Sequence, residues 1–338
     1  MQQKDLKIET LRGLTIILVV AGHVIGSAPE GGMRIQYPHM FRYVYTWIDY
    51  IQMPLFTALA GWVYALYFMK YQNSFFSFVY NKFKRLIIPM ACVGTLYFII
   101  QYLMPGTNQK GNLSEIWRIY VYPYTLYWYL PSLFWIFIIQ WLLDKYHIMD
   151  NYVKWIVVLI VCIAIHYAER YSIVISNPNL FSYRGALNQL PYFVLGVGLV
   201  RFKNELYTKC WGYISVLFSI IGILLVHIEW QYICIGEKFP RSCELLEIIS
   251  LLMILYILLS RVRFVNKYLV FIGLYSYAIY LFHGFGTSGG RIILKSIGVQ
   301  NEFIIFTFSL IISVFIPILI AKIGTRYKLF RIFFLGNK

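Results

Sequence analysis

The sequence predicts an all-α, polytopic membrane helix bundle of about ten transmembrane helices, with both termini in the cytoplasm. Of its 338 residues, 60% are hydrophobic and only 13% are charged, and the mean hydropathy is +0.65. Soluble domains carry about 25% charged residues, so a soluble fold is excluded. Apolar runs of about 20 residues have the length that spans a bilayer. Such runs are expected at residues 8–28, 47–69, 84–104, 126–143, 153–168, 186–201, 210–229, 243–260, 265–285 and 302–323.

The connections between these runs are short, and the longest cover residues 105–125 and 169–185. Neither has the length of a separate folded domain. Residues 1–338 are therefore expected to form one integral membrane domain. All functional groups must come from the bundle and its short loops.

Basic residues concentrate in segments that would be cytoplasmic if the N-terminus is inside, for example Lys82–Arg85 and Arg261–Arg263. This bias in Lys and Arg orients a membrane protein and also attracts anionic lipid headgroups. The formal net charge of +16 is thus explained by topology and lipid contact. It does not indicate a nucleic-acid partner.

The five cysteines show no CxxC pair and no Cys/His cluster, so no metal site is expected. Cys234 and Cys243 share one predicted outer loop, where thiols can oxidise. A disulfide between them is predicted, and two free thiols are the alternative.

Arg12 and His23 bracket a segment with no other charged residue. Eleven residues of helix rise about 16 Å and turn almost back to the starting direction, so both side chains are expected on one face. A guanidinium at the membrane entrance can bind phosphates, and an imidazole three turns deeper can act as a general base or as a nucleophile. Helix packing by His23 and lipid anchoring by Arg12 are the structural alternatives.

A second basic cluster, with Lys82, Lys84 and Arg85, lies at the cytoplasmic mouth of the third predicted span. Lys82 and Arg85 are i, i+3 neighbours on a helix and can converge on one anion. Anchoring by positive charge alone would also explain the cluster.

Four further side chains are candidates for the outer, acceptor side. Gln52 places an amide in the second span, and Trp128 belongs to a cluster of aromatic residues that would suit sugar rings, although such residues are also common at bilayer interfaces. Glu244 and His283 lie near the outer ends of their predicted spans. We therefore keep Gln52, Trp128, Glu244 and His283 as acceptor-side candidates.

In order along the chain, four segments resemble acyltransferase family 3, whose members are integral membrane proteins that transfer acyl groups, usually acetyl, from coenzyme A to sugars and other surface glycoconjugates. The segments are similar to the family's Arg-x10-His signature, its Pro-Leu-Phe element, its basic third-span entrance and its late Ser-Tyr-x-x-Tyr-Leu-x-His segment. In this sequence they are residues 8–23, 53–61, 82–89 and 275–283. Ala60 stands where the family usually has Ser, and Lys82 stands where Arg is common.

The resemblance implies an O-acyltransferase of the stand-alone form, without a fused extracytoplasmic esterase-like domain, in a bacterial inner or plasma membrane. Arg12, Lys82, Lys84 and Arg85 would bind the donor, acetyl-CoA or another acyl-CoA, and His23 with Arg12 would be catalytic. The expected partners are the lipid bilayer, the acyl-CoA and a sugar or glycoconjugate acceptor. The acceptor's identity, the acyl length, the role of His23 as base or carrier, and a homo-oligomeric state are left open.

The competing class is a polytopic transporter or exporter of a glycan or small molecule. Ten spans and a central Arg/His pair would suit a proton-coupled carrier. The two halves of the chain, however, show no recurrence and no matching spans broken by Gly or Pro, which are the marks of many carriers. The acyltransferase is the favoured interpretation.

Overall fold

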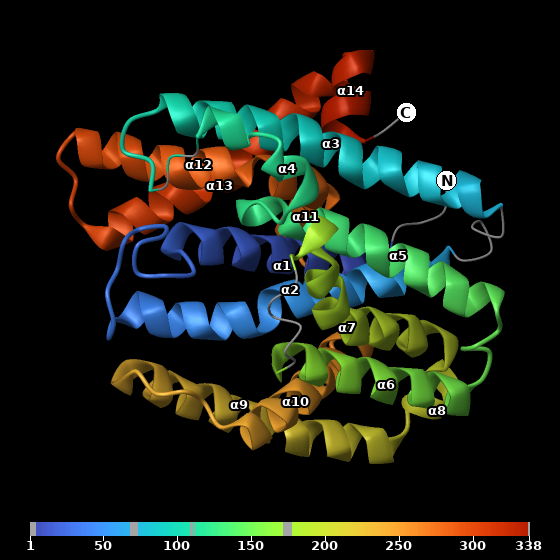
Figure 1. Ribbon diagram of the computed structural model, residues 1–338. Coiled ribbons are helices and arrows are strands. Elements are labelled where there is room, and N and C mark those ends of the chain that lie inside the picture. The colour runs from blue at the N-terminus through green and yellow to red at the C-terminus, as the bar shows by residue number, and fades with distance from the viewer. Residues whose placement is uncertain (1–4, 68–73, 109, 111, 172–177, 337–338) are drawn as a thin grey trace.

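The computed structural model describes residues 5–67, 74–108, 110, 112–171 and 178–336, and every regular element in them is a helix. The long helices lie side by side in one bundle (Figure 1). In chain order they are α1 (Leu6–Ile25), α2 (Met40–Leu66), α3 (Phe75–Leu103), α5 (Tyr129–Lys145), α6 (Tyr152–Tyr171), α7 (Tyr183–Arg201), α9 (Lys209–Ile235), α10 (Arg241–Ser260), α12 (Ser276–Ser296) and α13 (Glu302–Gly324). The short ones are η2 (Leu113–Glu115), α4 (Arg118–Val121), η3 (Thr125–Trp128), η5 (Leu180–Ser182), α8 (Lys203–Leu206), α11 (Lys267–Leu274) and α14 (Lys328–Leu335).

The prediction of an all-α, multi-pass membrane fold is confirmed. Among the described residues, seven helices are long and apolar enough to cross a membrane, or eight if the bent pair α11 and α12 forms one span. The count of ten spans and the cytoplasmic location of both termini stay predictions.

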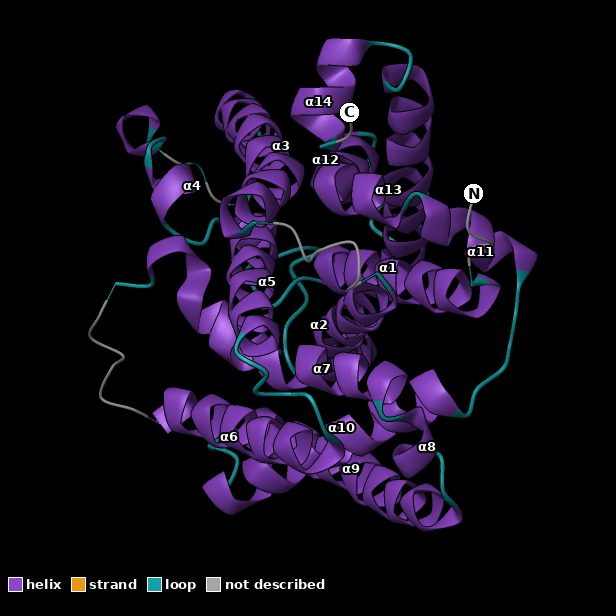
Figure 2. Cartoon of the chain, turned by 90° about the vertical axis from the view of Figure 1, so that its right-hand side faces the viewer, coloured by secondary structure: helices purple, strands orange, loops and turns teal. Residues whose placement is uncertain are grey.

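The helices α2 and α7 are too polar to count as apolar spans by themselves, because they lie inside the bundle. Their polar side chains face protein: the Thr57 hydroxyl of α2 donates a hydrogen bond of 2.9 Å to Gln189 Oε1 of α7. Figure 2 shows α1, α2 and α7 near the centre, with α3, α6, α9 and α13 around them. The peripheral helices carry the apolar surface that lipid requires, whereas polar groups are kept to the interior.

Glycine allows α2 and α7 to approach closely. A Cβ at Gly61 would stand 2.1 Å from the Phe193 carbonyl oxygen, and one at Gly196 would stand 2.0 Å from that of Ala58. Small residues at such crossings let helices in a membrane pack backbone to backbone. Any larger side chain at either position would force the two central helices apart.

The expected ninth span over residues 265–285 is wrong as a single straight helix. The chain breaks at Tyr275, where α11 and α12 meet at 81°, and α12 continues to Ser296. The run of Gly and Ser after residue 285 lowers the local hydropathy, but it forms a helix contact: Cβ atoms at Gly286 and Gly290 would stand 2.6 Å and 2.7 Å from the Ser313 and Ser309 hydroxyls of α13. Packing, rather than hydropathy, therefore sets the length of α12.

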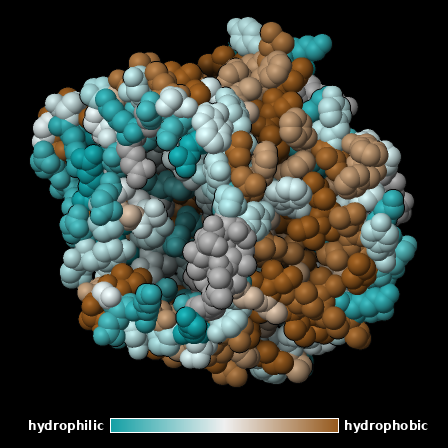
Figure 3. All heavy atoms as spheres, viewed as in Figure 1, coloured by the Kyte–Doolittle hydropathy of each residue, from teal (hydrophilic) through white to brown (hydrophobic). Residues whose placement is uncertain are grey.

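The helix α1 is central because α2, α11, α12 and α13 all contact it. It begins at Asp5, whose side chain accepts hydrogen bonds from the backbone N–H groups of Lys7 and Ile8 and so caps the helix. Its two ends lie at opposite ends of the bundle (Figure 1). Figure 3 shows hydrophilic residues gathered around a hollow at the left-hand end of this face, and hydrophobic residues to the right of it.

Candidate active site

The helix α1 carries Arg12 in its first half and His23 in its last turn. Each lines a different cavity: Arg12 lines one of about 160 Å³, here the Arg12 cavity, and His23 lines one of about 290 Å³, here the His23 cavity. The eleven residues between them correspond to about 16 Å of helix rise. The two predicted catalytic residues thus lie toward opposite ends of one helix and line different cavities.

The Arg12 cavity collects three of the four predicted donor-binding residues. Arg12 comes from α1, and Lys82 and Arg85 come from α3. The remaining lining is mainly apolar and aromatic: Phe56, Leu59, Ala60, Val63, Tyr64, Leu86, Tyr129, Leu133, Phe137 and Tyr277. A concentration of positive charge beside an apolar slot is complementary to an anion that carries a thin, weakly polar chain.

The basic side chains of α3 differ in environment. Arg85 is exposed, whereas Lys82 is only 8% exposed and its ammonium stands 3.4 Å from the centre of the Phe137 ring, a cation–π contact. Lys84, which was also expected to bind the donor, is not part of the cavity lining, because its ammonium stands over the ring of Tyr80 at 4.1 Å. Arg85 is therefore the cation of α3 most accessible to a ligand.

The guanidinium of Arg12 is oriented by Glu9, one helical turn before it. The Nη1 of Arg12 donates a hydrogen bond of 3.0 Å to Glu9 Oε1. Glu9 lies where α11 approaches most closely, because a Cβ at Gly273 would stand 2.0 Å from the Glu9 carbonyl oxygen. Because the chain bends between α11 and α12, α11 packs closely against the Arg12 end of α1.

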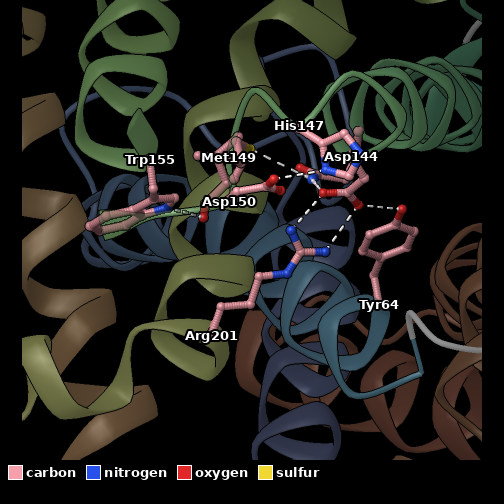
Figure 4. Close-up of polar contacts among 9 residues, drawn as sticks. Tyr64, Asp144, His147, Met149, Asp150, Trp155 and Arg201 are labelled. Carbon is pink, nitrogen blue, oxygen red and sulfur yellow. Dashed lines mark hydrogen bonds and ion pairs between the residues drawn. The ribbon is translucent and has the colours of Figure 1, made fainter. Parts of the chain in front are cut away.

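An ion pair between buried Asp144 and half-buried Arg201 links the helices around this end of the bundle. Asp144 of α5 accepts hydrogen bonds from both Arg201 Nη1 (2.5 Å) and Arg201 Nη2 (3.0 Å) of α7, and from the Tyr64 hydroxyl of α2 (2.7 Å), as Figure 4 shows. Bidentate pairing of this kind fixes geometry as well as charge. Since Tyr64 also lines the Arg12 cavity, these contacts link α2, α5 and α7 beside that cavity.

His23 packs against a second histidine. The ring centres of His23 and His283 are 5.0 Å apart. The sequence placed His283 near the outer end of a span, but it lies within α12 and is fully buried. His283 lies in the first half of α12 because this helix begins after the break at Tyr275 and continues to Ser296.

The hydrogen bonds of His283 define its tautomer. Its Nδ1 lies 2.8 Å from the Tyr280 carbonyl oxygen and 3.1 Å from that of Ile279. Carbonyl oxygens only accept, so Nδ1 carries the proton and Nε2 of the neutral ring is an acceptor. Within the described residues this Nε2 is buried and has no hydrogen-bond partner, and His283 itself does not line the His23 cavity.

Gln52 lies directly behind His23. It is 6% exposed, and a Cβ at Gly22, the neighbour of His23, would stand 2.7 Å from Gln52 Oε1. Its Nε2 donates a hydrogen bond of 3.1 Å to Asp49 Oδ1. The lack of a side chain at residue 22 is therefore what admits this amide next to α1, although Gln52 does not line the His23 cavity.

A third and larger cavity, of about 430 Å³, adjoins the His23 cavity, since Ser27 lines both; it is called here the Trp128 cavity. It contains the predicted Trp128, together with several tyrosines and carboxylates. These are Tyr37, Tyr45, Tyr50, Tyr192, Asp49, Glu229 and Glu247. Aromatic faces beside hydrogen-bonding carboxylates suit a polyhydroxylated ring.

Three predicted residues lie elsewhere. Glu244 is in the first turn of α10 and is not part of the lining of these cavities, whereas Glu247, one turn later, is. Cys234 and Cys243 are free, half-buried thiols, so the expected disulfide is not formed in this structure. The helices α9 and α10 extend through both positions, and helix packing rather than a closable loop sets their separation.

Sequence reasoning missed Arg291, which is 4% exposed and lines the His23 cavity with Asn108. Both were assigned to loops. The signal that could have found Arg291 is its i, i+8 spacing from His283, which places it about 80° round the helix, within one broad helix face. No group of three His, Cys, Asp or Glu that could hold a metal ion occurs in the part of the chain that is described.

Comparison with known proteins agrees with this geometry. Residues 5–322 match the family model described as an acyltransferase domain, acyltransferase family 3. No curated protein and no solved structure matches the chain. Because the match covers nearly the whole bundle, from the start of α1 to the end of α13, the chain belongs to acyltransferase family 3 and is a membrane acyltransferase.

Proposed function

We propose that the protein transfers an acyl group, acetyl in the first instance, from cytoplasmic acetyl-CoA to a hydroxyl of a sugar or surface glycoconjugate at the extracytoplasmic side of the cell membrane. One observation carries the proposal. A single helix, α1, presents a cation to a basic cavity at one end and an imidazole to a polar cavity at the other.

The donor enters through the Arg12 cavity. Arg12 and Arg85 bind the phosphates of the coenzyme, and Lys82 adds positive charge from deeper in the wall. The apolar and aromatic lining then receives the pantetheine arm. That arm and the roughly 16 Å between Arg12 and His23 are of the same order of length, which brings the thioester toward the imidazole.

His23 performs the chemistry with one of two balanced routes. As a general base, it takes the proton of the acceptor hydroxyl while that oxygen bonds to the thioester carbon; the carbon–sulfur bond then breaks and the thiolate of coenzyme A takes up the proton. As a carrier, its nitrogen attacks the thioester carbon and the carbon–sulfur bond breaks, which releases the thiolate of coenzyme A; the acceptor oxygen then attacks the acyl-imidazole, the carbon–nitrogen bond breaks, and the hydroxyl proton goes to the thiolate or to the freed ring nitrogen. In either route, the His23 ring nitrogen that does not react would donate a hydrogen bond to His283 Nε2, a bond that is not formed in this structure, in which the two ring centres are 5.0 Å apart.

The acceptor occupies the polar chambers at the His23 end. The combined His23 and Trp128 cavities present aromatic rings for the faces of a sugar and carboxylates for its hydroxyls. No hydrogen bond joins His23 to another described residue, which leaves its nitrogens to an incoming hydroxyl.

Purified protein in lipid nanodiscs, supplied with radiolabelled acetyl-CoA and de-esterified surface glycans, tests the proposal. We expect release of coenzyme A and alkali-labile label in the glycan. A carrier, the alternative function, would consume no acetyl-CoA. Binding of acetyl-CoA without label in any hydroxyl-bearing acceptor would reject the assignment of the acceptor class, and failure to bind acetyl-CoA would reject the donor.

A further inference from the structure

Two arginines that the proposed chemistry does not use converge on one amide beside the His23 cavity. Arg291 of α12 donates to Asn108 Oδ1 and also to the Gly106 carbonyl oxygen at 3.3 Å. The Nε of Arg34 donates to the same Asn108 oxygen at 2.9 Å. Asn108 is itself held by a hydrogen bond of 3.3 Å to the Gly32 carbonyl oxygen.

The charge of this cluster is not balanced within the described residues. Arginine keeps its charge in proteins, yet the acceptors of both guanidiniums are a neutral amide and a backbone carbonyl. Neither Arg34 nor Arg291 has an ion-pair partner in the described part of the chain. Glu30, exposed and also in the lining of the cavity, pairs with neither.

Burial makes this imbalance costly. Arg291 is only 4% exposed, and two cations that share a neutral oxygen repel each other more strongly in a partly desolvated site than in water. An anion placed between them would remove the repulsion. Arg34 uses only its Nε in the contacts described, so its two terminal nitrogens remain available as donors.

The cluster lies where it can select a substrate. Arg291 and Asn108 line the same cavity as His23. Arg291 follows His283 by eight residues of α12, about 12 Å of helix rise, a distance that a mono- or disaccharide can bridge. An anionic group bound at the arginines would hold a neighbouring hydroxyl near the histidines.

We infer that the Arg34–Asn108–Arg291 cluster binds an anionic group of the acceptor, a carboxylate or a phosphate, so that the substrate is an acidic glycan rather than a neutral one. The planar guanidinium fork matches either oxyanion in a bidentate manner. This inference rests on the proposed function and specifies the class of its acceptor.

The probes are surface glycans extracted from cells that carry the gene, freed of esters by mild alkali and separated by anion exchange into acidic and neutral fractions. We expect the protein in nanodiscs to transfer label from acetyl-CoA about 10- to 100-fold more efficiently to the acidic fraction, the range that one or two charge-assisted contacts supply. Reduction of carboxyl groups in one sample and removal of phosphate from another will show which oxyanion is recognised. Equal labelling of both fractions would overturn the inference.

Three variants test whether Arg34 and Arg291, rather than the overall positive charge, cause the preference for acidic glycan. Arg291→Gln and Arg34→Gln should lose most of the preference for acidic glycan while acetyl-CoA binds with unchanged affinity. Lys295→Gln, which removes an exposed cation from the same helix, should keep it. Arg34 is exposed, so its variant tests the site even if Arg291→Gln fails to fold. Retention of the preference in Arg34→Gln and in any folded Arg291 variant would contradict the inference, whereas no label in either fraction would reject the proposed function itself.

Discussion

The two cavities at the ends of α1 differ in size and in lining. The Arg12 cavity is small, about 160 Å³, and combines three cations with an apolar wall. The His23 cavity, about 290 Å³, and the adjoining Trp128 cavity, about 430 Å³, are larger and mostly polar. A basic cavity with an apolar wall suits a long phosphorylated donor, and larger polar chambers suit a hydrated acceptor of variable shape.

The difference extends to how each end is held. The Arg12 end is braced by an ion pair, Asp144 with Arg201, and by close backbone contact between α1 and α11. At the His23 end, His283 Nε2 and Gln52 Oε1 are buried without partners among the described residues. Unpartnered buried atoms also occur among the described residues of the Arg12 end, at Glu9 Oε2 and Gln140 Oε1, so the difference in how the two ends are held lies in the ion pair and in the backbone contact.

The largest effect is expected for His23→Ala. Removal of the base or acyl carrier should lower the rate of transfer by at least about 10²-fold, while the binding of acetyl-CoA at the other end of α1 changes little. Label transfer and calorimetric titration of acetyl-CoA will measure the two separately. His227→Ala, an exposed histidine of α9, is the matched control. A folded His23→Ala protein with near-normal turnover would show that the division of labour between the cavities is wrong.

Substitutions at the Arg12 end should weaken the binding of acetyl-CoA, which His23→Ala is expected to leave nearly unchanged. Arg12→Gln and Arg85→Gln should each weaken acetyl-CoA binding by about 10-fold or more, with a steep dependence on salt, and should leave the affinity for the acceptor unchanged. Lys84→Gln is the control, because its ammonium stands over Tyr80, outside the cavity lining. Equal acetyl-CoA affinity in all three variants would show that the donor does not bind in the Arg12 cavity.

A smaller loss is expected for His283→Phe, which keeps the ring contact with His23 but removes the acceptor Nε2. If His283 only positions His23, the maximal rate should fall by about 10-fold, less than for His23→Ala, with the Michaelis constant for acetyl-CoA unchanged. His283→Gln, which can restore a hydrogen-bond acceptor, should recover part of the rate. Loss of the His23 orientation alone would be visible as a shifted pH profile of the maximal rate. A His283→Phe enzyme with the full rate and an unchanged profile would show that the second histidine is only packing.

The features predicted correctly from the sequence are those that depend on one helix. The long apolar runs identify most of the helices that can cross a membrane, and helix geometry gives the rise between Arg12 and His23, whereas the roles of these two residues stay predictions. What could not be predicted depends on contacts between helices. The pairing of His23 with His283 requires the break at Tyr275, and no apolar pattern marks that break.

Arg291 shows the same limit. Its segment has a run of Gly and Ser that resembles a loop, and only the contact of Gly286 and Gly290 with α13 makes it helical. The sequence predicts spans at residues 47–69 and 186–201, yet α2 and α7 are not apolar enough to count as spans by themselves, and their polar side chains are buried inside the bundle. Packing between segments far apart in the sequence decides each of these cases.

The smallest loss of activity is expected for Gly22→Ala. It is compared with Gly13→Ala, because an added Cβ would meet a side chain at Gly22 but backbone at Gly13. A Cβ at Gly22 would meet the movable end of Gln52 at 2.7 Å, whereas one at Gly13 would stand 2.0 Å from the backbone oxygen of Leu269. Gly22→Ala should therefore shift Gln52 and lower transfer less than about 10-fold, with an unchanged melting temperature and unchanged donor affinity. Gly13→Ala must move α11 away from α1, and overpacking of this kind costs about 1–3 kcal/mol or more, so it should unfold at a clearly lower temperature. If Gly22→Ala instead lowered the melting temperature as much as Gly13→Ala, the His23 end would be as tightly packed as the Arg12 end, and the expected contrast between the two ends would be wrong.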